Sequence, residues 1–306
     1  PEGIEQELLR VLTPEGHCLV PVKVEFTGES WSAGDPRTID YGQRSWTVYQ
    51  KVRPAEIADW THYLYDASNS CVSDDTVVDA PFHLRWKGGP LWSRAHEVMA
   101  STSAMVSEGG RVYTIVDEGP AASTLLPADW QLTARDAFNG SLLWKKPIGE
   151  WQTHYWPWKS GPAHMPRKLV AVGGKVYLPS SIRGSIIELD GATGQQLRTF
   201  EPTAAADELI IQGKTLLTLS NYSPPDPAEV EEYRKRRRWW MYDGLHRAYL
   251  DYDGGRRIVA TCLDTGKTQW EVPFDQISPL TLTATSDCVF LHDGKRIRCL
   301  TLADGN

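Results

Sequence analysis

The sequence contains no long apolar segment, little cysteine and no excess of positive charge. No uninterrupted apolar run approaches the roughly 18 residues that span a bilayer, so we expect no membrane span. A formal net charge of −7 excludes a general attraction for nucleic acid or an anionic membrane surface. The 5 cysteines are odd in number and lack CxxC spacing, which excludes a dense disulfide framework and a standard zinc site. Cys262, Cys288 and Cys299 lie in strand-like stretches and are predicted to be buried free thiols, with one bridge among them left open.

What the sequence does contain is typical of a soluble globular protein. Its 306 residues are 41% hydrophobic and 23% charged, enough for one large or two ordinary domains. Its 13 tryptophans are many for this length and require a structural reason.

The strongest pattern is a repeated turn followed by an apolar strand. The four copies lie at 135–140, 189–194, 263–266 and 300–305, and their turn residues are Asp136, Gly140, Asp190, Gly194, Asp264, Gly266 and Gly305. The third copy is two residues shorter, and Thr301 replaces Asp in the last. Val176 to Thr215 is 39 residues, and Gly266 to Gly305 is also 39. A unit of about 40 residues predicts a four-stranded propeller blade, with loop insertions in the longer intervals.

The residue types of the repeat fit that role. Glycine accepts the positive φ of a tight reversal, and aspartate accepts hydrogen bonds from turn amides. Trp144 and Trp270 each follow a turn glycine by four residues, so each is predicted to slot between neighbouring sheets. The alternative is a β-sandwich with coincidental turn signals.

Leu189–Gly194 and Leu263–Trp270 resemble the pyrroloquinoline-quinone (quinoprotein) repeat, whose pattern is roughly ALDxxTGxxxW. The resemblance implies an all-β fold, a partial β-propeller with about four blades of an eight-bladed ring. The rest of its own chain would then complete the ring.

The first 55 residues differ in pattern from the rest. The periodicity predicts a helix over 2–12, and strands over 17–24 and 45–52. The string LLRVLTPEGHCLV resembles the helix–turn–strand near the end of class I S-adenosylmethionine-dependent methyltransferases. It would then be a small α/β remnant of such a domain, although any helix–turn–strand unit has this pattern. Residues 56–306 form the propeller part, with a helical insertion at about 222–256.

The order of these parts resembles a bacterial family that fuses a methyltransferase-like domain to a quinoprotein-like propeller. The matching stretches include residues 53–69, 90–120, 132–148 and 156–177. Both ends look cut, so we expect the chain to be a fragment. The methyl-donor loop would precede Pro1, and S-adenosylmethionine would bind only in that missing part.

Two groups of residues are candidates for ligand binding. Trp92, Arg94, His96, Asp117 and Glu118 concentrate polar and aromatic groups at loop–strand junctions. They would hold an anion or Ca²⁺, or pair with one another between blades.

The second group is His154, Trp156, Trp158 and Lys159, whose rings suit sugar stacking or the closure of one blade onto the next. The quinone-and-Ca²⁺ constellation of known quinoprotein dehydrogenases cannot be placed in the sequence. No cofactor is therefore expected in this fragment. The basic run 234–238 is interpreted as a solvated helix face rather than a nucleic-acid site.

These observations leave three hypotheses. The first is a non-catalytic propeller segment that binds or scaffolds, with a polysaccharide or protein ligand. The second is a methyltransferase whose propeller selects the substrate. The third is a pyrroloquinoline-quinone-dependent alcohol or sugar dehydrogenase. The propeller resemblance favours a location outside the cytoplasm, whereas a methyl donor is found inside it.

Overall fold

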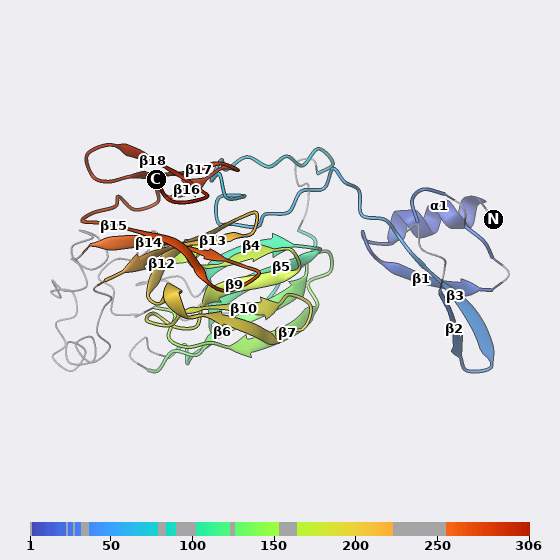
Figure 1. Cartoon of the computed structure of the whole chain (residues 1–306). Coiled ribbons are helices and arrows are strands. Elements are labelled where there is room, and N and C mark those ends of the chain that lie inside the picture. Colours follow the sequence, from blue (N-terminus) through green and yellow to red (C-terminus); the bar gives the residue numbers. More distant parts are fainter. Residues whose placement is uncertain are drawn as a thin grey trace. The chain divides into compact units, whose positions relative to one another are not determined.

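The structure, a computed structural model, describes residues 2–22, 24–26, 28–31, 37–78, 84–89, 102–122, 126–152, 164–222 and 255–306. The chain divides into two compact units (Figure 1): Pro1–Ala58 with Asp74–Arg85, and Asp59–Ser73 with Trp86–Asn306. Nearly all of the predicted helical insertion at 222–256 lies outside the described residues. Among those that are described, no helix is long and apolar enough to cross a membrane.

The N-terminal unit packs one helix against a three-stranded sheet. Its elements are α1 (Glu2–Val11), β1 (His17–Pro21), β2 (Arg37–Tyr41) and β3 (Arg44–Gln50). The sheet order is β1-β3-β2, with both pairs antiparallel. The strand predicted over 17–24 ends at Pro21, whose ring nitrogen has no N–H to donate. β2 was not predicted.

The helix is held to the sheet at its C-terminal end. Lys51 Nζ donates to the carbonyl oxygens of Leu9 (2.7 Å) and Leu12 (2.9 Å), which α1 leaves without intrahelical partners. Leu8, Leu9 and Leu12 pack on a core centred on Trp31 and Tyr49. The amphipathic pattern of the helix thus places one side on the sheet.

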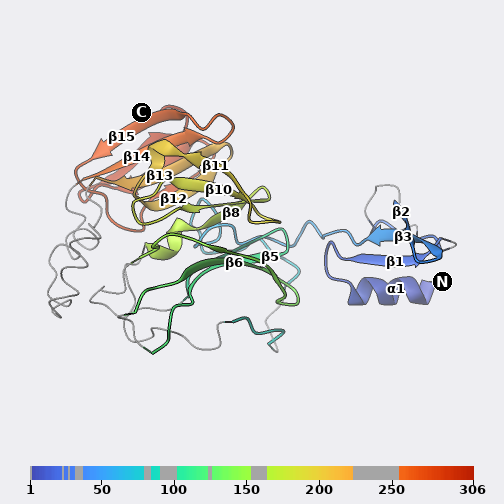
Figure 2. The same ribbon diagram turned by 90° about the horizontal axis from the view of Figure 1, so that it is seen from below.

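The second unit is built of antiparallel sheets in chain order, and the predicted propeller-blade fold is confirmed. Figure 2 shows these sheets following one another from β5 and β6 to β13–β15.

The first blade is β4 (Thr102–Glu108), β5 (Arg111–Asp117), β6 (Trp130–Asp136) and β7 (Leu142–Pro147). The second is β8 (Val170–Val172), β9 (Lys175–Pro179), β10 (Ile186–Asp190) and β11 (Gln196–Phe200). The third is β12 (Ala206–Gln212), β13 (Thr215–Asn221), β14 (Arg256–Cys262) and β15 (Thr268–Phe274). A three-stranded sheet follows, β16 (Thr283–Ala284), β17 (Cys288–His292) and β18 (Ile297–Thr301). Two short 3₁₀ turns, η1 (Met165–Lys168) and η2 (Glu201–Thr203), precede β8 and β12.

The third strand of every blade ends in the same turn. The residue that opens the turn accepts the N–H of the glycine four positions on, and donates to the carbonyl five positions on. The opening residues are Asp136, Asp190, Cys262 and Thr301. All four turns therefore have the same length, and the shorter third copy predicted from the sequence is wrong. The sequence pattern equates Leu263-Asp264 with Leu189-Asp190, whereas in the structure Cys262 is the residue equivalent to Asp190.

Asp264 has a different hydrogen-bond partner from Asp190, the aspartate that opens the second turn. Asp190 accepts hydrogen bonds from the amides of Ala192 (3.0 Å) and Thr193 (2.8 Å). Asp264 instead accepts a hydrogen bond from Lys214 Nζ at 2.7 Å, and both side chains are exposed. In the third turn the Cys262 thiol occupies the aspartate position, and hydrogen bonds from Thr265 lower its pKa.

The tryptophans join neighbouring blades at these turns. Trp144 Nε1 donates to Gly191 O in the next blade at 3.0 Å. The same contact joins Trp86 to Ala137 O and Trp270 to Leu302 O, both at 2.9 Å. At the remaining junction Arg198 replaces tryptophan, and its guanidinium donates to Leu263 O. Three of the 13 tryptophans are therefore explained by blade junctions.

The cysteines do not fit their prediction fully. All five are free thiols, as expected. Cys262 and Cys288 are only half-buried and Cys299 is exposed, so the predicted burial of these three thiols is wrong. Cys18 is the buried one.

Candidate functional site

The first strands of successive blades lie beside one another, and one segment of the chain crosses all four. This segment, Asp59–Asn69, is called the strap. It accepts one backbone N–H from each first strand. The four bonds are Ser107 N to Trp60 O (2.8 Å), Ala171 N to Thr61 O (3.0 Å), Ile211 N to His62 Nε2 (3.1 Å) and Ala284 N to Ala67 O (2.9 Å).

The four donors occupy the same position in their blades. Ser107, Ala171, Ile211 and Ala284 each pair with the second residue of the following strand. In each first strand the N–H at this position points away from its own sheet, because alternate residues of an antiparallel strand bond to opposite sides. The strap therefore satisfies one equivalent donor on every blade.

His62 is the most constrained residue of the strap. Its ring is buried, Nε2 accepts the Ile211 N–H, and Nδ1 lies 2.8 Å from Thr61 Oγ1. Since Nε2 is an acceptor, the neutral ring carries its proton on Nδ1. Burial lowers the pKa of His62 to about 4; Asp66 partly opposes this and the Arg167 charge adds to it.

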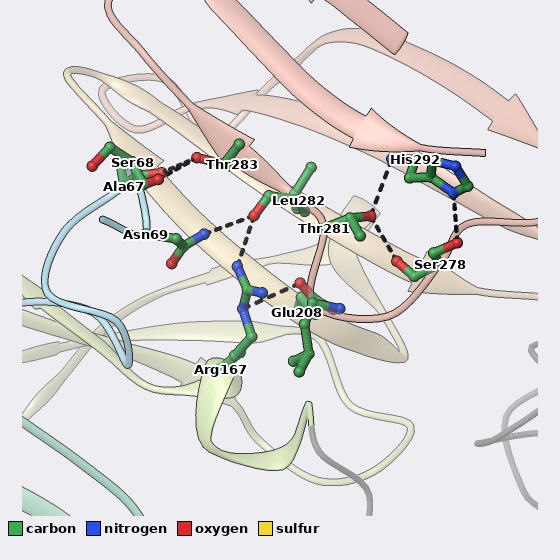
Figure 3. A network of polar contacts seen from close by, with 11 residues as sticks. Ala67, Ser68, Asn69, Arg167, Glu208, Ser278, Thr281, Leu282, Thr283 and His292 are labelled. Atoms are coloured by element: carbon green, nitrogen blue, oxygen red, sulfur yellow. Dashed lines mark hydrogen bonds and ion pairs between the residues drawn. The ribbon is translucent and has the colours of Figure 1, made fainter. Parts of the chain in front are cut away.

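Beside the strap, charged side chains from η1 meet β12 in the interior. Arg167 Nε lies 3.3 Å from Glu208 Oε2, and both side chains are almost fully buried. Glu208 Oε1 accepts the N–H of Leu280 at 2.9 Å. Figure 3 shows Arg167 pointing towards Glu208 and towards Leu282 O, which also accepts a hydrogen bond from Asn69. This contact ties η1, the third blade and the segment before β16 together.

A second buried acid lies next to the first. Asp207 Oδ2 accepts a hydrogen bond from Arg256 Nε at 2.9 Å, and Oδ1 lies 3.9 Å from His164 Nε2. Burial raises the pKa of Asp207 and of Glu208, and the neighbouring arginines partly offset both rises. Burial also lowers the pKa of Lys168 and holds that of His164 well below its ordinary value. The two carboxylates are thus engaged by arginines rather than open to a substrate.

An apolar pocket of about 540 Å³ opens between the strap and β4. Its lining includes Trp60, Tyr63, Met105, Val112 and Pro166. Trp60 Nε1 donates to Tyr63 O at 3.0 Å, which fixes the indole against the strap.

Of the ligand-binding candidates predicted from the sequence, the structure describes two, Asp117 and Glu118. Asp117, at the end of β5, is buried, and its carboxylate accepts the amides of Gly119 (2.9 Å) and Asp129 (2.8 Å). Glu118 accepts a hydrogen bond from Lys145 on β7. These contacts join a loop and a strand of one blade. Among the described residues, no group of three or more His, Cys, Asp or Glu is placed to hold a metal ion.

The other candidates lie outside the described residues. They are Trp92, Arg94, His96, His154, Trp156, Trp158 and Lys159. Sequence reasoning missed the strap and the buried charge cluster. The available signals were the aromatic residues within 59–69, and the charged pairs Arg167-Lys168 and Asp207-Glu208 beside apolar strands.

No protein-family model matches the sequence, and a search of curated proteins finds no match. Among solved structures, the chain is similar to a quinohaemoprotein alcohol dehydrogenase from Comamonas testosteroni, with 15% identity over 76% of this chain and 29% of that one, and a TM-score of 0.40. It is also similar to BamB from Moraxella catarrhalis, with 13% identity over 66% and 49% of the two chains, and a TM-score of 0.36. The computationally designed protein Ika4 shares 11% identity over 70% and 96%, with a TM-score of 0.39. The chain spans less than half of the dehydrogenase and of BamB, and likenesses at this level carry no argument about activity.

Proposed function

We propose that this chain is a non-catalytic propeller segment that binds or scaffolds within a larger protein. The observation that carries the proposal is the strap. The equivalent backbone donors of four first strands, where the blades converge, are used by the chain itself rather than left for a cofactor. Beside the strap, the buried acid Glu208 ties η1 to the third blade through Arg167, and Asp207 pairs with Arg256 inside that blade, which suits a rigid scaffold.

Trp86 supports the proposal that further blades complete a ring. Its indole makes the contact that the outer-strand residues Trp144 and Trp270 make at their junctions. The described stretch Leu84–Gly89 carries this tryptophan but forms no strand pairing. We therefore propose that the rest of its own chain supplies the remaining strands of that blade, and that the ligand is a polysaccharide or another protein.

A methyltransferase whose propeller selects the substrate is the second candidate. The observation in its favour is the N-terminal unit, in which a helix and a turn lead into β1 and the last strand, β3, pairs antiparallel with β1. This arrangement agrees with the end of the methyltransferase-like sheet that the sequence resembles. In that case we expect this chain alone to have no measurable affinity for S-adenosylmethionine.

The dehydrogenase alternative has a direct test. The full-length protein is incubated with pyrroloquinoline quinone, Ca²⁺ and primary alcohols or aldoses, and reduction of an electron-accepting dye is followed. We expect no reduction above the rate without protein. Quinone-dependent turnover would overturn the non-catalytic proposal. The methyltransferase hypothesis is tested by calorimetry of S-adenosylmethionine with the 306-residue chain. Binding would show that the methyl-donor site lies within these 306 residues.

A further inference from the structure

The edge of β4 next to the strap has an open position. Because the Ser107 N–H points away from β5 and bonds to Trp60, the N–H and C=O of Met105, two residues earlier, face the same side. The strap does not reach them, because Thr61 and His62 already bond to the second and third blades. No backbone partner for Met105 on this side occurs within the described part of the chain.

The last sheet shows how an occupied edge looks. Leu282 stands two residues before Ala284, as Met105 stands two before Ser107. Leu282 O accepts hydrogen bonds from Asn69 Nδ2 and from Arg167 Nη2, both at 2.7 Å. The equivalent carbonyl of Met105 receives no such donor from the strap or from η1.

The open edge faces the apolar pocket of about 540 Å³, whose lining includes every residue from Thr102 to Ser107. Two large side chains of the lining, Met105 and Tyr63, are 59% and 40% exposed. Backbone donors and acceptors beside an apolar hollow are what an added β-strand requires, since main-chain bonds supply affinity and the hollow takes a side chain. A sugar presents hydroxyl groups on a polar ring and matches this lining less well.

We propose that the β4 edge at Met105 binds an extended polypeptide segment of a protein partner as an added antiparallel strand, with one apolar side chain in the pocket. The inference rests on the proposed binding function and names its ligand class and its site. The added strand continues the antiparallel pairing that Trp60 begins at Ser107 and that the strap then leaves. The pocket lining, which includes Trp60 and Val112, favours an aliphatic side chain at the residue that faces it.

The test uses the 306-residue chain and an acetylated, amidated seven-residue peptide of alternating threonine and leucine. Binding is followed by the NMR shift and the hydrogen-exchange rate of the Met105 amide, and we expect that amide to become protected. Met105→Pro removes the edge N–H without removing a bond to β5, because proline is tolerated on a free edge. This variant is expected to bind the peptide at least about tenfold more weakly, which is the effect of one lost hydrogen bond.

Met105→Leu is the matched control, since it keeps both the N–H and an apolar side chain, and its affinity should stay within about threefold of the parent value. A peptide N-methylated on the residues that face β4 should fail to bind the unmodified chain, which gives a readout that does not depend on the folding of a variant. Undiminished binding to Met105→Pro, tight binding of the methylated peptide, or no binding of the plain peptide would each overturn the inference. None of these outcomes bears on dehydrogenase turnover, so the dye-reduction assay tests the proposed non-catalytic function independently of this inference.

Discussion

The indole of Trp144 lies over Gly194 of the next blade, and its nitrogen donates to Gly191 O at 3.0 Å. A Cβ atom on Gly194 would sit 2.7 Å from the indole carbon Cε3, closer than real contacts allow. Glycine is therefore required at this position for two separate reasons. It adopts a φ of +72°, and it leaves room for a ring that belongs to another sheet.

Gly194→Ala tests this double requirement, with Gly213→Ala as the matched control. Gly213 has a φ of +58°, but a Cβ there meets nothing within 4 Å. We expect the control to lose about 1 kcal/mol of unfolding free energy from the left-handed backbone alone. Gly194→Ala should lose roughly 2 to 4 kcal/mol, because displacement of Trp144 adds an overpacking cost. Urea unfolding measures both, and equal losses would show that the ring contact contributes nothing.

The two aspartates that the sequence pattern treated as equivalent should respond differently to substitution. Asp190→Ala removes the acceptor of two turn amides, whereas Asp264→Ala removes only an exposed pair with Lys214. We expect Asp190→Ala to lower the midpoint of thermal unfolding more than Asp264→Ala. The effect of Asp264→Ala should disappear in 1 M salt, where the Debye length is about 3 Å. A salt-sensitive loss in Asp190→Ala would contradict this assignment.

Those aspartates illustrate what could be predicted from the sequence. The turn glycines and the inter-blade tryptophans follow from local chemistry, so the blades were recognisable before the structure. The register of the third turn was not, because Cys262 accepts the hydrogen bonds that aspartate accepts elsewhere, and a search for aspartate selects Asp264 instead. The strap was also unpredictable, since its bonds to Ala171, Ile211 and Ala284 join residues far apart in sequence and use backbone donors that every residue has.

The strap should make stability depend on pH through His62. Unfolded histidine binds a proton below about pH 6.5, whereas in the fold the pKa is about 4. Between these values the unfolded chain holds more protons, so stability falls as the pH falls from 6.5 to 4. The loss from this residue is roughly 3 kcal/mol.

His62→Gln isolates this contribution, because its amide oxygen accepts the Ile211 N–H without titrating. The slope of unfolding free energy against pH should decrease by at most about 1.4 kcal/mol per pH unit, one proton, while the slope from His164 remains. His62→Leu is the contrasting variant. It also lacks the titration, but it leaves the Ile211 donor unpaired and should be destabilised at pH 7 by about 1 to 3 kcal/mol. An unchanged slope in His62→Gln would show that another group provides the pH dependence.

Removing one partner of the buried pair Arg167–Glu208 should cost more unfolding free energy than removing both. Glu208→Gln keeps the acceptor for the Leu280 N–H but leaves the Arg167 charge uncompensated in the interior. We expect it to lose about 3 to 5 kcal/mol of unfolding free energy. The double variant Arg167→Met with Glu208→Gln removes the charge as well, and should recover part of that loss. A double-mutant cycle by urea unfolding measures the coupling. Additive losses would mean that the two side chains are screened from one another, and that η1 is held to the third blade by packing and by the bond from Arg167 to Leu282 O.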